Sequence, residues 1–571
     1  MEFLPPWTGS FLGAVLATAL LLVTALHRRR HRRRSSSATR KHYNLPPGPR
    51  PWPVIGNLDL IGALPHRSIH ELSARHGGGA PLPLMSLRFG SVPVVVASTV
   101  DAARFVLKTH DASFIDRPKM ASGRYTAYNF SDIVWAPYGA YWRQARKLWQ
   151  TTLFSARQLR SQEHARGEEL RAMLRGLLPP PPPPSSSSPA TASVAVELKE
   201  RLILLNLNVV SRMALGRKYV VEGGGAAGSS SPVTPGEFRW MVDELFHLNG
   251  VLSVGDFIPW LGWMDLQGYV GRMKRLAKMF DRFLEHVLDE HIERRRREGD
   301  VFVARDVVDL LLELADDPSL EVPIGRDGVK GFALPGQVPR LAGRWVHHDA
   351  MFEDLIAGGT DTSAVAVEWA MSELLRHPDV MAKATKELDT VIGRDRLVTE
   401  HDIPKLPYLE AIVKETFRLH PVTPLLAPRL SREDASMSTG GAHYDVPAGT
   451  LVFVNVWTIS RDPTVWGPTA EEFTPERFAG SAVDVKGQDL ELLPFGSGRR
   501  MCPGYTLGLK MVQLTLANLL HGFEWRLPDG VKVEELSMEE KFGLAVPRKV
   551  PLEVVAEPRL PAHVYEEPAG A

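Results

Sequence analysis

Residues 493–504 read LPFGSGRRMCPG, and this stretch contains Cys502, the one cysteine in a chain of 571 residues. Glycines at 498 and 504 allow the backbone to turn tightly and to approach a flat ligand closely. Arg500 offers a planar fork of donors for a carboxylate, and Cys502 is a soft ligand once it is deprotonated. The composition of the stretch therefore favours a ligand-binding loop.

The surroundings of Cys502 support this interpretation. A single cysteine excludes an intrachain disulfide and is typical of a chain that folds on the reducing side of a membrane. Taken alone, such a cysteine is most often a small buried hydrophobe. However, Leu507, Met511 and Leu514 resume a helical spacing directly after it. We therefore expect Cys502 just before the amino-terminal end of a helix, where amide groups and the helix dipole favour a thiolate.

Five positions of this loop resemble a known family. Phe495, Gly498, Arg500, Cys502 and Gly504 match the haem-binding loop of cytochromes P450. The resemblance implies a mainly α fold with small β-sheets, the cytochrome P450 fold. It also implies haem b as the cofactor, contacts from Phe495 and Gly504, and Cys502 as the axial thiolate ligand of the iron.

Residues 358–363, GGTDTS, lie in a helical apolar pattern and resemble the oxygen-binding part of the family's long central helix. Glycine costs up to about 1 kcal/mol relative to alanine inside a helix, so the glycine pair indicates that a groove is wanted there. By resemblance, Thr362 would donate a hydrogen bond during oxygen activation and Asp361 would help to relay protons. The alternative is a helix with one loose turn.

Trp142 and Arg146 lie four residues apart in a helical stretch and so face the same way. An indole N–H and a guanidinium are good donors to carboxylates, and the family uses the matching pair for the two haem propionates. Arg500 would bind the cofactor as well. Arg429 lies near the place of a further propionate ligand in related enzymes.

A second set of matching residues is structural. Glu415 and Arg418 lie one helical turn apart in KETFRLHP, and Arg477 lies in the stretch PERF at 475–478. An exposed pair at this spacing would contribute a few tenths of a kcal/mol. In the family, these three residues form a buried network, and such a network is strongly destabilised when one charge is removed.

The amino-terminal residues 1–34 predict a single transmembrane helix with a basic stop. An apolar run from Phe11 to Leu26 precedes six arginines at 28–30 and 32–34, whereas Glu2 is the one charge before it. This order is the reverse of a secretory signal and places the catalytic domain in the cytosol, on the endoplasmic reticulum membrane. A cleaved or merely interfacial segment is the alternative. Residues 35–55, which include LPPGP at 45–49, predict a stiff Pro-rich hinge.

Residues 56–571 would form one haem-binding monooxygenase domain. Low-complexity stretches at 179–189 and 222–235 predict surface loops. Residues 333–353 depart from the family pattern, because Pro335, Gly336 and Pro339 would break the first half of the central helix. We interpret this stretch as an unspliced intron or a gene-model error. A peptide from the native protein spanning Gln337 to His348 would contradict that interpretation.

The net charge of +1, with 44% hydrophobic and 23% charged residues, gives no reason to expect a nucleic-acid partner. The resemblance is closest to plant microsomal P450s. It implies a monooxygenase that uses O2 and takes electrons from NADPH–cytochrome P450 reductase, with cytochrome b5 as a further candidate donor. The substrate would be an apolar flavonoid, phenylpropanoid or terpenoid. The alternatives are a haem enzyme that rearranges peroxides without a reductase and an inactive haem-binding membrane protein.

Four segments should border the substrate channel above the haem if the resemblance holds. They are residues 120–134, 249–269, 422–426 and 542–546. Their side chains are apolar or mixed, which is equally expected of an ordinary hydrophobic core. They therefore do not identify the substrate.

Overall fold

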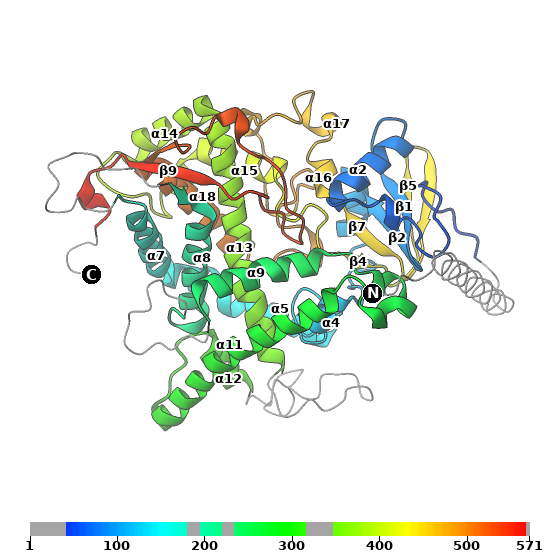
Figure 1. Ribbon diagram of the computed structural model, residues 1–571, viewed down its shortest axis with the longest axis horizontal. Coiled ribbons are helices and arrows are strands. Elements are labelled where there is room, and N and C mark those ends of the chain that lie inside the picture. The colour runs from blue at the N-terminus through cyan, green and yellow to red at the C-terminus, as the bar shows by residue number, and fades with distance from the viewer. Residues whose placement is uncertain (1–40, 180–194, 220–232, 316–345, 567–571) are drawn as a thin grey trace, which may run out of the picture.

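The computed structural model describes residues 41–179, 195–219, 233–315 and 346–566. Helices make up most of it, and the strands form three small sheets (Figure 1). The helices are α2 (Pro65–His76), α3 (Val100–Arg104), α4 (Ala121–Tyr125), α5 (Ala140–Leu148), α6 (Ala156–Ser161), α7 (Glu163–Gly176), α8 (Leu198–Leu215), α9 (Pro235–Gly250), α10 (Val254–Phe257), α11 (Tyr269–Glu298), α12 (Val307–Ala315), α13 (Val346–Arg376), α14 (Pro378–Ile392), α15 (Pro407–Leu419), α16 (Val456–Ile459), α17 (Pro463–Trp466) and α18 (Tyr505–Gly522). The predicted mainly α class with small sheets is confirmed.

The largest sheet lies at one end of the molecule, beside α2 (Figure 1). Its order is β1 (Leu84–Phe89), β2 (Val92–Ala97), β7 (Leu451–Val454) and β4 (Arg429–Leu430). β2 and β7 are parallel, whereas β1 and β4 are antiparallel to their neighbours. The other two sheets join β3 (Val196–Glu197), β9 (Glu553–Pro558) and β8 (Phe523–Arg526), and β5 (Ala435–Thr439) with β6 (Ala442–Val446). Pairing with Val452 of β7 holds Arg429 at the inner end of the first sheet.

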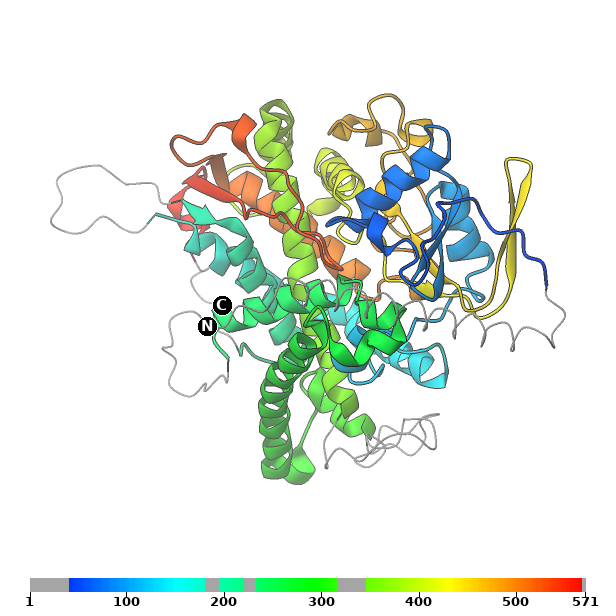
Figure 2. The ribbon, with the colours of Figure 1, turned by 45° about the vertical axis from the view of Figure 1, so that its right-hand side comes forward.

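The long helix α13 runs through the middle of the helical part (Figure 2) and packs against α8, α15 and α18. The helix is continuous through the GGTDTS stretch, so the loose turn considered above is not observed. The two glycines of this stretch have different surroundings. A Cβ on Gly359 would lie 2.7 Å from Val210 of α8, whereas a Cβ on Gly358 would meet nothing within 4 Å. Gly359 thus permits close helix packing, and Gly358 leaves open space.

The described part of the Pro-rich hinge, from residue 41 onward, is hydrogen-bonded to the first sheet. The carbonyl of Pro47 accepts a hydrogen bond from the N–H of Ser86 in β1 at 2.9 Å. A Cβ on Gly48 would lie 1.9 Å from the Ser86 carbonyl oxygen, so only glycine fits. The predicted membrane helix falls within residues 1–40, outside the described residues. Among the described residues, no helix has both the length and the apolar character needed to span a membrane.

The two predicted loops at 179–189 and 222–235 fall mostly outside the described residues. At the end of the second, the prediction is wrong, because Pro235 already begins α9. Thr234 accepts a hydrogen bond from the N–H of Glu237, and the Glu237 carboxylate accepts one from the N–H of Thr234. This capping box fixes the helix start. Most of the suspected insertion at 333–353 also lies outside the described residues, and its last eight residues, 346–353, belong to α13.

Candidate active site

The LPFGSGRRMCPG loop folds tightly around Cys502. Gly498 has φ +71°, and a Cβ there would lie 2.3 Å from the carbonyl oxygen of Leu107. The N–H of Cys502 donates to the Phe495 carbonyl at 3.0 Å. Helix α18 then begins at Tyr505, and a Cβ on Gly504 would press on the Phe154 ring at 3.2 Å. The predicted placement of Cys502 just before a helix is confirmed.

The Cys502 thiol borders a cavity of about 290 Å³ that lies between this loop and α13. Burial raises the pKa of the thiol, whereas an N–H of Gly504 and the charge of Arg146 lower it. A buried thiolate in this place therefore needs a further cation, and a metal ion bound to the sulfur provides one. Phe495 also lines the cavity, and its ring meets Phe417 edge to face at 5.6 Å.

Four arginines line one side of the cavity: Arg117, Arg146, Arg429 and Arg500. Arg429 pairs with Asp111 at 2.9 Å and donates to the Ser497 carbonyl at 3.1 Å. Arg500 donates to the carbonyl groups of Ile115, Ile133 and Ala136. Among the described residues, no carboxylate forms an ion pair with Arg117, Arg146 or Arg500.

This arrangement fits a doubly negative ligand. Burial lowers the pKa of Arg500 to about 10 and that of Arg117 well below its usual value. Buried cations without anions are costly, and guanidinium groups bind carboxylates in a fork geometry. The two propionates of haem would supply the missing charge, while Cys502 lies within reach of the same space. The residues present therefore fit the predicted cofactor.

Arg117 is a residue that sequence reasoning missed. Its guanidinium donates to the carbonyls of Val134, Ala427 and Pro428 at 2.7–2.9 Å. Its place before Pro118 indicates extended backbone, but no local signal brings it beside Arg500, which lies far away in the sequence.

Trp142 and Arg146 both line the cavity, as their spacing predicts. The indole N–H of Trp142 donates to the Ile133 carbonyl at 3.0 Å, and the Arg500 guanidinium lies over its ring at 4.4 Å. The Arg146 guanidinium lies 5.9 Å from the same ring centroid. Trp142 thus orders the two arginines, and its role as a propionate donor stays a prediction.

The side chains of Thr362 and Asp361 point in different directions. Thr362 borders the cavity, and its hydroxyl donates to the Gly358 carbonyl at 2.8 Å. Asp361 is buried away from the cavity lining and lies 3.3 Å from Lys199 of α8. Lys199 in turn lies 3.0 Å from Asp243 of α9. The predicted pair is adjacent in sequence, but only Thr362 faces the space beside Cys502.

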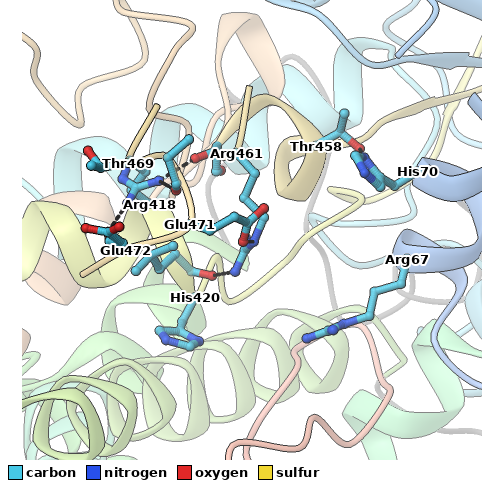
Figure 3. A network of polar contacts seen from close by, with 12 residues as sticks. Arg67, His70, Arg418, His420, Thr458, Arg461, Thr469, Glu471 and Glu472 are labelled. Atoms are coloured by element: carbon cyan, nitrogen blue, oxygen red, sulfur yellow. Dashed lines mark hydrogen bonds and ion pairs between the residues drawn. The ribbon is translucent and has the colours of Figure 1, made fainter. Parts of the chain in front are cut away.

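The structural network forms as expected. The Glu415 carboxylate receives two bonds from Arg418, at 2.7 and 2.8 Å, and one from Arg477 at 2.9 Å. Arg418 also donates to the carbonyl of Glu472 at 3.0 Å (Figure 3). Beside it, Arg461 donates to the Leu419 carbonyl at 2.6 Å and pairs with Glu471. The network ties α15 to the chain that precedes the cysteine loop.

Comparison with known proteins decides the family. The Cytochrome P450 family model matches residues 46–322 and 347–552. This chain is a cytochrome P450. Membership confirms the predicted family, the monooxygenase class and the use of haem, O2 and a redox partner.

This P450 has close plant relatives. It is 49% identical to the trimethyltridecatetraene synthase of Zea mays, covering 96% of this chain and 95% of the relative. It is 48% identical to the dimethylnonatriene synthase of Zea mays, covering 97% and 99%. It is 42% identical to the flavonoid 3'-monooxygenase of Arabidopsis thaliana, covering 97% and 98%.

The P450 family model skips residues 323–346, which overlap the suspected insertion at 333–353. The gap agrees with the interpretation that this stretch departs from the family, although the origin of the stretch stays a hypothesis. In the described part of the chain, α13 begins at Val346 and contains the GGTDTS stretch, which the family model matches.

The predicted channel segments divide into two groups. Ile133, Val134, Val422, Leu426 and Leu544 line the main cavity. A neighbouring cavity of about 40 Å³ has lining residues from the same segments, including Met120, Gly250, Leu425 and Phe542.

For residues 256–269, the channel prediction is wrong. None of these residues lines either cavity. The N–H of Ser91 donates to the Phe257 carbonyl at 2.9 Å and holds this segment on the first sheet. Trp263 points outward instead and is 83% exposed.

Proposed function

We propose that this P450 is a membrane-bound haem b monooxygenase that inserts one atom of O2 into an apolar plant terpenoid. The other oxygen atom leaves as water, with two electrons from NADPH delivered by NADPH–cytochrome P450 reductase and two protons from solvent. Cytochrome b5 is a further candidate donor of the second electron. The observation that carries the substrate assignment is the aliphatic wall of the cavity.

That wall offers few partners for substrate hydroxyls. Its side chains are Ile133, Val134, Val209, Val210, Leu355, Ala366, Val422, Leu426 and Leu544. The amide of Asn206, which also borders the cavity, already donates to the Thr360 carbonyl at 3.1 Å. Each buried hydroxyl left unpaired would cost about 1–3 kcal/mol, so a polyhydroxylated ring system binds poorly here. A hydrocarbon-like terpenoid loses nothing by burial against this wall.

The names of the relatives also favour a terpenoid over a flavonoid as the substrate. The two synthases at 48–49% identity are named for apolar polyenes, and the monooxygenase at 42% is named for a flavonoid. A flavonoid is the second candidate substrate. The hydroxyl groups of Thr423 and Thr362, which face the cavity, favour it because they could bind a phenol.

Each site residue has a defined task in this proposal. Haem b held by Cys502 supplies the binding and activation of oxygen when it is present. Arg117, Arg146 and Arg500 bind the propionates, and Arg429 closes the same side together with Asp111. Thr362 donates or accepts a hydrogen bond beside the reacting oxygen, because its hydroxyl lies in the cavity wall.

Asp361 would pass protons from the side of α8 and α9. Burial raises the pKa of Asp361, although the charge of Lys199 opposes this shift. Asp243, which contacts the same Lys199 ammonium group, has a quarter of its side chain exposed to solvent. The three groups therefore connect the outside of the helical core to the residue beside Thr362.

Replacing Asp361 with asparagine should lower product formation by about 10²-fold, the usual size of a general acid contribution. Asparagine keeps the shape but cannot pass a proton. With the reductase and NADPH supplied, the fraction of consumed NADPH that yields product should fall, and hydrogen peroxide should rise. An Asp361→Asn protein with unchanged product yield and rate would contradict the relay. Glu313, which is exposed on α12, provides the control substitution Glu313→Gln.

Exposed apolar side chains of the catalytic domain support its contact with a membrane. Trp260, Trp263 and Leu266 are exposed by 48%, 83% and 59%, and Trp52 of the hinge is also exposed. Phe257 and Ile258 pack in the same apolar cluster as Val54, so these exposed side chains lie on neighbouring segments. Tryptophan favours the interface between lipid and water. We therefore assign this face to the cytosolic surface of the endoplasmic reticulum membrane, below the single-pass anchor.

A fluorescent probe at position 263 tests this assignment. Trp263→Cys in the full-length protein, labelled with a polarity-sensitive dye, should shift its emission to shorter wavelength in lipid vesicles. Asp379→Cys on α14, at the far end of the molecule, is the matched control and should show no shift (Figure 1). Equal emission from the two sites would contradict the assignment.

The turnover of candidate substrates tests the proposed function. The purified protein, reconstituted with the reductase and NADPH, should oxidise apolar acyclic terpenoids at least tenfold more efficiently, by kcat/KM, than flavonoids. The reverse order would select the second candidate. Turnover of an organic hydroperoxide without NADPH or reductase would instead support peroxide rearrangement.

A further inference from the structure

Residues 131–136 form a short loop, here called the strap, which lies beside the arginines of the cavity. Its carbonyl groups accept hydrogen bonds from Tyr141 and from three side chains that line the cavity. The bonds are Tyr141 to Ser131 at 2.5 Å, Trp142 to Ile133 at 3.0 Å, Arg117 to Val134 at 2.9 Å and Arg500 to Ala136 at 2.7 Å. The strap therefore determines where the donors of the cofactor site point.

A carboxyl group of the central helix holds the strap from the other side. The N–H of Ile133 donates to Oδ2 of Asp354 at 2.6 Å. Asp354 lies on α13 and borders the cavity, two helical turns before Thr362. Ile133 thus joins Asp354 through its N–H and joins Trp142 and Arg500 through its carbonyl, so two successive peptide groups of the strap are held at this residue.

Asp354 acts as an acceptor rather than as a counter-charge. Among the described residues, no arginine or lysine forms an ion pair with it. Burial raises the pKa of Asp354 well above its usual value, and the nearby Asp132 carboxylate raises it further. Asp132 itself accepts the Trp135 N–H at 2.8 Å, inside the strap. Burial raises the pKa of Asp132 as well, although the charges of Arg500 and Arg117 oppose this shift. The contact that Asp354 makes with the strap is therefore the oxygen that accepts the Ile133 N–H.

We propose that Asp354 is a positioning residue of the haem site, which holds Ile133 so that the strap orients Arg117 and Arg500 toward the propionates and keeps the Trp142 ring beside Arg500. This inference rests on the proposed haem b site. Asp354 does not touch the propionates in this scheme, and its effect reaches the cofactor through the backbone of one residue, Ile133. A backbone N–H buried without an acceptor is costly, so removal of the carboxyl should shift the strap.

Two substitutions separate an acceptor from a charge. Asp354→Asn keeps an oxygen acceptor and removes the charge, whereas Asp354→Leu keeps the volume and removes the acceptor. Glu368 supplies the matched control, because it lies buried on the same helix and accepts the Leu552 N–H at 2.9 Å, outside the cavity lining. Glu368→Leu removes an equivalent bond without contacting the strap.

The measured quantities are the rate of haem transfer from the full-length protein to excess apomyoglobin, the thermal midpoint, and amide exchange in peptides covering residues 131–136. We expect Asp354→Leu to lose haem at least about tenfold faster, a change that corresponds to about 1.4 kcal/mol. Exchange in the strap should rise in the same variant. Asp354→Asn should stay within about twofold of the original protein. Glu368→Leu should lower the thermal midpoint and leave haem loss unchanged.

Equal haem loss from Asp354→Leu and Glu368→Leu at matched thermal midpoints would overturn the proposal. Haem loss from Asp354→Asn as fast as from Asp354→Leu would overturn it as well, because charge would then be the cause. If Asp354→Leu does not fold, the original protein decides, since the Ile133 amide must be protected from exchange and rapid exchange would contradict the role. An original protein that binds no haem would instead contradict the proposed function.

Discussion

Replacing Glu415 with glutamine is expected to destabilise the fold by about 3–5 kcal/mol, the usual cost of removing one partner from a buried ion pair. Glu415 and Arg418 are completely buried, and Arg477 shares the same carboxylate. The substitution leaves two guanidinium groups without their counter-charge. Because folded proteins have only about 5–15 kcal/mol of stability, this loss would remove a large share of the total.

Denaturant unfolding measures this loss, and the same helix supplies its control. Glu410 pairs with Lys414 on the exposed side of α15, with 48% of its side chain accessible. Glu410→Gln should change stability by less than about 1 kcal/mol, as is usual for exposed pairs. A Glu415→Gln protein as stable as the Glu410→Gln protein would show that the network does not support the fold.

Replacing Cys502 with serine is expected to abolish NADPH-dependent product formation. A hydroxyl is not deprotonated near neutral pH as a metal-bound thiol is, so the variant lacks the electron-donating thiolate. The four arginines and the cavity remain, since a serine is close to cysteine in size. Haem content by extraction should therefore fall less than activity does.

Met501→Leu, which keeps the volume next to Cys502, is the control and should keep most of the activity. Product formation by Cys502→Ser at more than about a tenth of the original rate would mean that another residue supplies the axial ligand. That result would also remove the reason for assigning the LPFGSGRRMCPG loop to haem binding.

Local motifs predicted the parts of this site that are encoded in short stretches. The cysteine loop, the GGTDTS helix and the Glu415 network each lie within a few residues or match a pattern with fixed spacing. Their glycines and charges have few alternative explanations once they occur together. Trp142 and Arg146 also followed from helical spacing, because both line the cavity.

The rest of the site depends on contacts between distant parts of the chain. Arg117, Asp354 and Lys199 carry no local signal, because each acquires its partner only when helices and loops pack together. Asp361 was placed with Thr362 by adjacency, yet successive residues on a helix point about 100° apart. One faces Lys199 and the other faces the cavity.

The resemblance to plant P450s predicts that the segment 256–269 borders the channel. Its composition suits a channel wall and a membrane surface equally well. The hydrogen bond between Ser91 and Phe257 holds the segment on the first sheet, and no sequence pattern predicts this contact.

The central claim is that Cys502 is the thiolate ligand of haem iron, and the carbon monoxide difference spectrum of the reduced full-length protein tests it most directly. The account predicts a Soret band at about 450 nm, as the name of the family implies. Its absence from a folded protein that contains haem would contradict the thiolate ligand and, with it, the proposed function.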